Sequence, residues 1–414
     1  MQDESPGRFS DEPRQNENTI ADEPTQEMPS SAGQLASRLP NTPGVTVTAS
    51  PLRSPKSRRR KLSPLRLALI IFGVFVLLFG GTLAAGYMYY VNTIQKPVSQ
   101  FIRPVSRSTS EPTTNPTPGY DSIKGRSWNI LLLGSDNDQK FSFPAVLTQV
   151  MMIVHIDTQN DSVSMVSIPR DSWVAVPDAG MHKIDQAFLL GASGGGGFEG
   201  GVRLARATVE KAFGITIDRY AWVGLDGFAK VIDTLGGVDV DVTHPIVDDN
   251  YPNDTGAGAH PNDPYSFKRV YIAAGPQHLN GEEALEYVRS RHADQIGDIG
   301  RTQRQQQVLE ALKQKLTLSS IVNNLPTLIK DLNGKVYTDL NEQEMLDFAN
   351  FGRGLSSSAI QRVTLGPGSE GYGDNANVYD ASTGTRQDVI IPHCEKIQPI
   401  LKRIFGAARC DVTG

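Results

Sequence analysis

The stretch YAWVGLDGFAKVIDTLGGVDVDV, residues 220–242, contains the pattern that decides the fold class. Tyr220 to Val223 is a short apolar run typical of a strand, and Asp226 to Leu235 has the spacing of a helix that ends at two glycines. Val238 to Val242 alternates apolar and acidic residues, as a strand with one buried face does. A strand, a helix and a second strand in succession predict an α/β fold, in which helices cover a sheet.

The residues before this stretch predict three more strands. Asn129 to Leu133 and Val150 to Ile156 are apolar runs, and we expect the first to stop at Gly134. Ser162 to Ile168 is the expected hairpin partner of the second run, because turn-forming residues separate the two. After the opening stretch, Asp248 to Phe267 is rich in Asn, Asp, Pro and Gly, and we expect a long loop there.

Two helices are predicted around the most basic segment of the chain. Asn280 can cap a helix from Gly281 to Val288, because Glu283 lies three residues later and completes a capping box. Asp298 can cap a second helix, from Ile299 to about Leu316. The segment from Tyr287 to Gln305, which spans the junction of these helices, carries arginine as its only cation. Arginine binds phosphate oxygens two at a time.

Four arginines of this segment predict a binding site for a diphosphate. Arg301, Arg304 and Gln305 share one face of the second helix, in its first turns, where the helix already favours anions. Arg289 and Arg291 are two residues apart, and in extended chain they would point the same way. Four cations around one point repel each other unless a multivalent anion joins them. The alternative is a set of surface ion pairs, but acidic residues are few within the segment.

The N-terminal quarter predicts a membrane anchor. Residues 1–62 are polar and end in a basic cluster, so we expect a disordered segment on the cytoplasmic side. Residues 67–91 are apolar and uncharged, long enough for a transmembrane helix, and would place the rest of the chain outside the cell membrane. A buried core helix and a cleaved signal peptide are the alternatives. The net charge is −5, which does not suggest nucleic acid as a partner.

The rest of the chain divides into a tether and two folded parts. Residues 92–126 are rich in Ser, Thr and Pro and predict an extended spacer. Residues 127–317 contain the strands and helices above, and residues 318–414 have weaker patterns that predict an α/β extension. The two cysteines, Cys394 and Cys410, could form a disulfide outside the membrane or remain two thiols.

Several motifs in order resemble the LytR-CpsA-Psr (LCP) family of cell-wall glycopolymer ligases, over about residues 127–317. Arg170 lies directly after a predicted buried strand, where α/β folds bind ligands. The motifs are Ser167-Ile168-Pro169-Arg170-Asp171, Leu279 to Leu285, Val288-Arg289-Ser290-Arg291 and Gly297 to Gln306, with looser matches at Gly134 to Asp136, Lys183 to Ala187 and Leu225 to Val238.

The resemblance implies a three-layer α/β/α domain with a mixed central sheet and an apolar tunnel for a polyprenyl chain. It also implies an enzyme that transfers a glycopolymer from a polyprenyl-diphosphate carrier to peptidoglycan, leaving a phosphodiester. The implied diphosphate ligands are Arg170, Arg289, Arg291 and Arg301, supported by Lys183 and Asp298, with Asp136 as a ligand of Mg²⁺. A carboxylate near the acceptor hydroxyl could take its proton, and Asp171 and Asp298 are the candidates.

One departure from the family pattern concerns the metal. Where the family has an aspartate before the second strand, this chain has Gln149, which is neutral, whereas Mg²⁺ binds mainly charged oxygens. Asp138 or Asp185 could supply the missing carboxylate. An alternative function is therefore a non-catalytic binder of lipid-linked glycan, or a scaffold for wall assembly, that uses the same pocket. A pyrophosphatase that only releases phosphate is a third possibility.

Overall fold

The structure, a computed structural model, describes residues 88–89, 91–106, 122–135, 146–256, 258–263, 265–291, 297–315, 324, 327–328, 330–406 and 409–413. The predicted cytoplasmic segment, residues 1–62, lies outside the described residues, and so does most of the predicted membrane helix, residues 67–91. In the described part of the chain, every helix is too short or too polar to span a bilayer.

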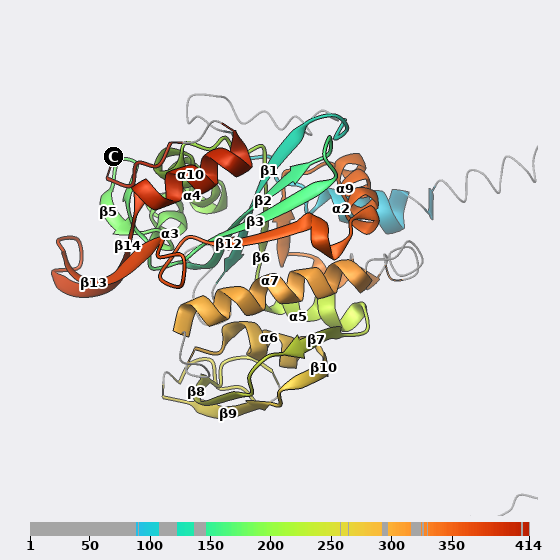
Figure 1. The fold of residues 1–414 in the computed structure, drawn as a ribbon. Coiled ribbons are helices and arrows are strands. Elements are labelled where there is room, and N and C mark those ends of the chain that lie inside the picture. Colours follow the sequence, from blue (N-terminus) through green and yellow to red (C-terminus); the bar gives the residue numbers. More distant parts are fainter. Residues whose placement is uncertain are drawn as a thin grey trace, which may run out of the picture. The chain divides into compact units, whose positions relative to one another are not determined.

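A six-stranded mixed sheet forms the centre of the fold (Figure 1). Its order is β11-β6-β1-β2-β3-β12. Strands β1, β2 and β3 are antiparallel neighbours, whereas β6 runs parallel to β1 and β12 runs parallel to β3. The bounds are β1 (Ser127–Ser135), β2 (Thr148–Asp157), β3 (Ser162–Ile168), β6 (Arg219–Val223), β11 (Val336–Thr338) and β12 (Ile360–Thr364).

The predicted strands are confirmed, with one difference at Gly134. Strand β1 continues through this glycine, which pairs with Val150 of β2. A Cβ atom at Gly134 would lie 2.9 Å from the Cβ of Val150, so the glycine allows the two strands to approach here instead of ending the first.

Both edges of the sheet come from residues 318–414, which were predicted to be an extension. Strand β11 pairs with β6 at one edge, and β12 pairs with β3 at the other. The boundary at residue 317 is therefore wrong, because the last part of the chain completes the sheet of the preceding part. Strands of three and five residues are too short to give a clear periodic signal in the sequence.

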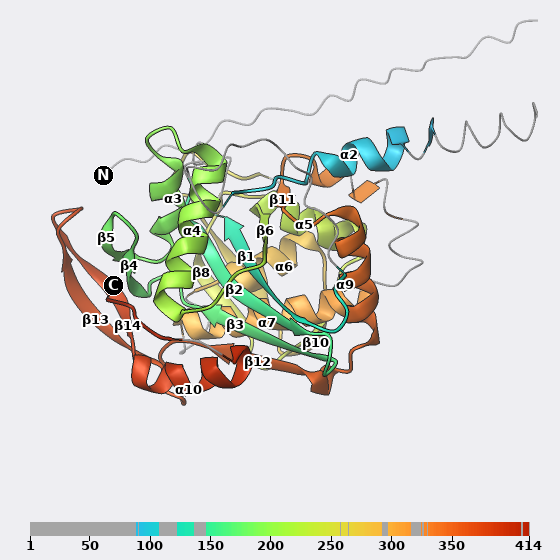
Figure 2. The same ribbon diagram turned by 90° about the horizontal axis from the view of Figure 1, so that it is seen from above.

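Helices cover both faces of this sheet (Figures 1 and 2). On one face, side chains such as Leu131 and Val166 pack against Phe188, Val209 and Leu401. These last three belong to α3 (Gln186–Ala192), α4 (Gly197–Phe213) and α10 (Cys394–Phe405). On the other face, Trp128, Ile130 and Ile156 pack against Phe348 and Phe351 of α9 (Glu342–Gly354).

A second hydrophobic core lies among three further helices and two small two-stranded sheets. It contains Ile232, Val240, Val270, Leu285 and Val308, all buried. The helices are α5 (Leu225–Thr234), α6 (Gly281–Arg289) and α7 (Gly297–Lys315), and the antiparallel sheets pair β7 (Val238–Val242) with β10 (Gly275–Leu279) and β8 (Ile246–Pro252) with β9 (Phe267–Ile272).

Two predictions in this region need correction. The expected loop from Asp248 to Phe267 is partly strand, because β8 extends to Pro252 and buries Ile246, Asp248 and Tyr251. Helix α7 begins at Gly297, so Asp298 lies in the first turn and is not the N-cap residue. The predicted capping box of α6 is confirmed, since Asn280 and Glu283 bond each other's backbone N–H groups.

The segment predicted as a tether is shorter than expected. After η1 (Val91–Gln95) and α2 (Lys96–Ser99), Phe101 and Val105 are buried. Ile102 forms a bridge with Thr338 of β11, and the guanidinium of Arg206 donates to the carbonyl of Val105. Residues 101–106 therefore belong to the folded domain, because their apolar side chains reach its core.

The remaining elements are short. They are two hairpins, β4 (Trp173–Val176) with β5 (Gly180–Lys183) and β13 (Gly373–Asp380) with β14 (Thr385–Pro392), and a short 3-10 turn, η2 (Ser357–Ala359). Cys394 at the start of α10 is bonded to Cys410, so the two cysteines pair. This disulfide ties the end of the chain to the core that covers the sheet.

Candidate active site

Gln149 lies between two of the predicted phosphate-binding arginines. Arg170 and Arg291 both donate to its side-chain oxygen, Arg170 through Nη1 and Arg291 through Nη2 at 3.2 Å. Gln149 is on β2, Arg170 follows β3 and Arg291 follows α6, so three separate segments meet here. The neutral oxygen of Gln149 orients the two guanidinium groups and adds no negative charge beside them.

The turn that follows β3 fixes the position of Arg170. Pro169 follows the last residue of that strand, and close packing at Gly366 brings Pro169 near the start of α7. A Cβ atom on Gly366 would lie 2.7 Å from Cγ of Pro169 and 3.1 Å from Cδ1 of Ile299. The N-terminal turn of α7, which favours anions, therefore lies next to the turn that holds Arg170.

Asp171 connects two cations at the same place. One of its carboxylate oxygens lies 2.8 Å from Nζ of Lys183, and the other lies 3.3 Å from Nε of Arg170. Lys183 is the last residue of β5, opposite Trp173 in the β4–β5 hairpin. The structure thus brings together Arg170, Asp171, Lys183 and Arg291 of the predicted site.

Asp185 is a buried carboxylic acid beside this group. Its backbone N–H donates to the carbonyl of Arg170 at 3.2 Å, and its own carbonyl accepts from Thr148. Its Oδ1 atom is buried and has no hydrogen-bond partner. Burial raises the pKa of Asp185 to about 7, although the positive charges of Arg170, Lys183 and Arg291 favour the carboxylate.

Arg289 and Arg291 do not point the same way, which corrects the expectation from their spacing. Arg289 is still helical, and its guanidinium forms a two-pronged ion pair with Asp254 at 2.9 and 3.1 Å. Burial opposes its charge, but Tyr251 and Asp254 hold the pKa of Arg289 above its usual value. Arg291 lies beyond the end of the helix, and its backbone N–H donates to the buried Asp248.

Arg304 supports the turn between the two helices. It is 5% exposed, and its guanidinium donates to the backbone carbonyls of Tyr287 and Ser290. Gln305 donates to the carbonyl of Val288 at 3.4 Å. Both side chains therefore bond the C-terminal end of α6, as cations near a helix C-terminus often do. Arg301 is equally buried, on the turn of α7 before them.

Three acidic residues considered for the site have no described side chain. Asp136 and Asp138 lie outside the described residues, and so does the side chain of Asp298. In the described ranges, no group of three or more His, Cys, Asp or Glu side chains could hold a metal ion. The oxygen of Gln149 already accepts from two cationic groups, so it does not suit Mg²⁺ as a ligand.

Asp248 and Asp254 are the residues that sequence reasoning missed. Asp248 accepts from the hydroxyl of Ser290 at 2.6 Å and from the N–H of Arg291, while Asp254 holds Arg289. Both lie where a loop was expected. The alternation of Ile246, Asp248 and the following residues was the available signal, since it places the acid on the same face as an apolar residue.

The fold and the arginine-rich site define a class of protein: an α/β domain with a mixed sheet and a cluster of cationic side chains at the end of β3. The model of the LytR_cpsA_psr family matches residues 88–390, more than half of the chain. The protein therefore belongs to the LytR_cpsA_psr family.

Named relatives agree with this assignment. The polyisoprenyl-teichoic acid–peptidoglycan teichoic acid transferase TagV of Bacillus subtilis (strain 168) is 30% identical over 260 residues, which are 62% of this chain and 61% of TagV. A transferase of the same description, TagU of Oceanobacillus iheyensis, is 29% identical over 78% of this chain and 90% of its own length. The crystal structure of B. subtilis TagV superposes with a TM-score of 0.51 at 26% identity, covering 68% of this chain and 97% of TagV's.

Proposed function

We propose that this protein is an extracytoplasmic phosphotransferase that moves a glycopolymer from a polyprenyl-diphosphate carrier to peptidoglycan through a phosphodiester. One observation carries the proposal. Arg170 and Arg291 share the oxygen of Gln149, and Lys183 lies across Asp171 from Arg170, so three cations converge from separate segments. Relatives named as teichoic acid transferases support the substrate class.

The reaction is a displacement at phosphorus. The acceptor hydroxyl oxygen attacks the phosphorus that carries the glycan, and the bond to the bridging oxygen of the diphosphate breaks. The prenyl monophosphate leaves with the electron pair of that bond, and a phosphodiester joins glycan and acceptor. Arg170, Arg291 and Lys183 stabilise the charge that develops on the phosphoryl oxygens and the leaving group. Asp171 is the base that takes the hydroxyl proton.

Mg²⁺ stays part of the proposal, because a divalent cation would add charge neutralisation at the phosphoryl oxygens. Mg²⁺ remains a prediction tied to Asp136, and the described residues offer it no second carboxylate at position 149. Arg289, Arg301 and Gln305 stay in the proposal as ligands of the diphosphate or as supports of the turn that carries Arg291. The apolar tunnel for the lipid also remains an expectation, because the lining of both cavities near the site includes polar side chains.

For its location, we propose a single membrane helix at residues 67–91, with the N-terminus in the cytoplasm and the folded domain outside. The basic cluster before that segment supports the orientation. The disulfide between Cys394 and Cys410 supports an oxidising compartment.

The test uses full-length protein with a synthetic prenyl-diphosphate-linked glycan and peptidoglycan sacculi. The expected result is glycan bound to the sacculi through phosphate, with release of prenyl monophosphate, and loss of both in the Arg170→Ala variant. Tight binding of the donor without any turnover, with or without Mg²⁺, would instead support a non-catalytic binder. Release of inorganic phosphate alone would support a pyrophosphatase.

A further inference from the structure

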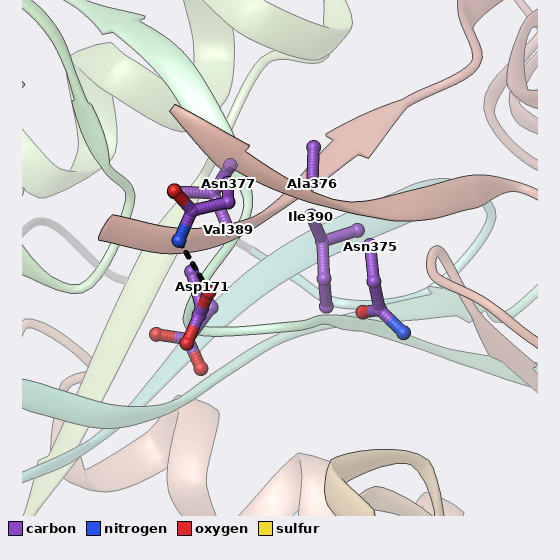
Figure 3. Close-up of a pocket in the computed structure, with 7 residues that line it drawn as sticks. Asp171, Asn375, Ala376, Asn377, Val389 and Ile390 are labelled. Carbon is purple, nitrogen blue, oxygen red and sulfur yellow. Dashed lines mark hydrogen bonds between the residues drawn. The ribbon is translucent and has the colours of Figure 1, made fainter. Parts of the chain in front are cut away.

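A cavity of about 500 Å³ is lined in part by Asp171, whose carboxylate also pairs with Arg170 and Lys183. Its lining consists of Asp171 and of two short runs, residues 375–377 of β13 and residues 388–390 of β14. Figure 3 shows Asp171 beneath the two strands, with Asn375 and Asn377 on one strand and Val389 and Ile390 on the other. This volume lies within the range of ordinary small-ligand sites.

The hairpin that forms this cavity is attached to the candidate active site. The N–H of Ile390 donates to the carbonyl of Asp171 at 2.9 Å, and Ser172 forms a parallel bridge with Ile390. Val389 and Ile390 are 2% and 5% exposed, so the strand is anchored by its apolar side. The hairpin therefore keeps a fixed position relative to the Arg170–Asp171 turn.

The chemistry of the lining selects against a phosphate. Its charged groups are the two carboxylates of Asp171 and Asp388, and none of the residues that line the cavity is a lysine or an arginine. A phosphate would meet negative charge here and find its cations only across Asp171. The donor diphosphate and the occupant of this cavity therefore bind in different places, and Asp171 belongs to both.

The same lining suits a neutral ligand rich in hydroxyl groups. Asn377 donates to Asp388 at 2.7 Å and accepts from Arg386, so its amide is held in one orientation. Asn375 is exposed, and its amide has no hydrogen-bond partner in the described part of the chain. Ala376, Val389 and Ile390 are the apolar residues of the lining. Sugar rings present this mixture of hydroxyl edges and C–H faces.

We propose that the cavity between Asp171 and the β13–β14 hairpin binds the acceptor saccharide, a neutral chain of amino sugars. The inference rests on the proposed function, and it assigns the acceptor side of the reaction to the last quarter of the chain. Asp171 would contact both substrates, because it pairs with the cations of the donor site and also lines this cavity. A proton leaving that hydroxyl has the carboxylate of Asp171 within the same cavity.

Binding is tested with chitotetraose, a soluble β-1,4 chain of N-acetylglucosamine, and full-length protein. Saturation-transfer NMR should detect binding to the wild type. Asn375→Ala should weaken it about three- to tenfold, as expected for one lost hydrogen bond. Ala376→Phe should abolish it by filling the cavity. Gln387→Ala is the matched control, because Gln387 lies on β14 next to Asp388 but does not line the cavity.

Kinetics with a prenyl-diphosphate-linked disaccharide as donor then separate the two substrates. Asn375→Ala should raise KM for chitotetraose by the same factor while KM for the donor stays unchanged. Wild-type protein that binds farnesyl diphosphate but not chitotetraose would overturn the acceptor site and leave the proposed function intact. Chitotetraose binding that Ala376→Phe abolishes, without binding or turnover of the donor, would refute the proposed function and keep the saccharide site. Equal chitotetraose binding by all four proteins would overturn the inference.

Discussion

Gln149 and Arg291 are 142 residues apart in the sequence, yet Nη2 of Arg291 lies 3.2 Å from Oε1 of Gln149. The same oxygen accepts from Arg170, so one neutral amide holds two cations near each other. A carboxylate in its place would neutralise part of their charge. A glutamine orients both guanidinium groups and leaves that charge for a substrate.

The first prediction concerns this amide. In Gln149→Ala the two guanidinium groups lose their common acceptor, and affinity for farnesyl diphosphate should fall about tenfold. In Gln149→Glu the new charge should compete with the diphosphate and weaken binding as well. Titration calorimetry measures both, and Gln343→Ala on the exposed surface of α9 serves as the control. Unchanged affinity in both variants would show that Gln149 does not organise the site.

The second prediction separates two arginines that the sequence grouped together. Arg291→Ala should abolish transfer and leave the melting temperature nearly unchanged, because the side chain is exposed. Arg304→Ala should lower the free energy of unfolding by about 2–4 kcal/mol, because buried carbonyls of Tyr287 and Ser290 lose their donor. Thermal melting and transfer assays on both variants test whether Arg291 acts in transfer and Arg304 in stability. The assignment is wrong if Arg304→Ala melts like the wild type.

The third prediction follows from the buried Asp185. Its pKa is about 7 in the folded protein, above the value of an exposed aspartate, so the folded state binds one more proton between pH 4 and 7. Stability should therefore fall as pH rises through this window, and the loss is complete above pH 7. Asp185→Asn should remove this dependence and raise the melting temperature at pH 8 but not at pH 4.

Melting curves of wild type and Asp185→Asn at pH 4, 6 and 8 provide the measurement. Asp388→Asn is a suitable control, because Asp388 is an exposed carboxylate. Parallel pH profiles for Asp185→Asn and the wild type would contradict a raised pKa at this position.

The fourth prediction concerns the disulfide. Breaking the bond between Cys394 and Cys410 releases a loop with a sequence separation of 16, which should cost about 3 kcal/mol. The Cys394→Ser and Cys410→Ser double variant should melt several degrees lower than the wild type, and reductant should lower the wild type to the same value. Reductant should leave the double variant unchanged, and any further fall there would point to another cause.

Much of the fold could be predicted from the sequence, because the patterns that indicate its strands and helices involve residues close together in the chain. The strand from Ser162 to Ile168 and the capping box of Asn280 with Glu283 depend on residues close in sequence, and both are confirmed. Strands β11 and β12 were not predicted, since such short segments become strands only through their partners. Pairing with neighbouring strands determines the structure of these two segments, and their local β-propensity carries little information about it.

The candidate site was predictable in its residue types but not in its partners. Convergence of Arg170 and Arg291 could be inferred from their motifs, whereas the acceptor between them could not, because Gln149 looked like the loss of a metal ligand. Arg289 was misjudged for a geometric reason. One more helical residue turns its side chain to Asp254, which lies in the loop just after β8.

The placement of β11 and β12 has a consequence for the order of events during biosynthesis. A ribosome that has produced residues up to 330 has made the four neighbouring strands β6, β1, β2 and β3, and both edges of this sheet are unpaired. Unpaired sheet edges can pair with other chains. Closure requires Val336–Thr338 on one side and Ile360–Thr364 on the other. The sheet can therefore be completed only after residue 364 has been translated, and a premature stop before residue 360 should yield an aggregating fragment.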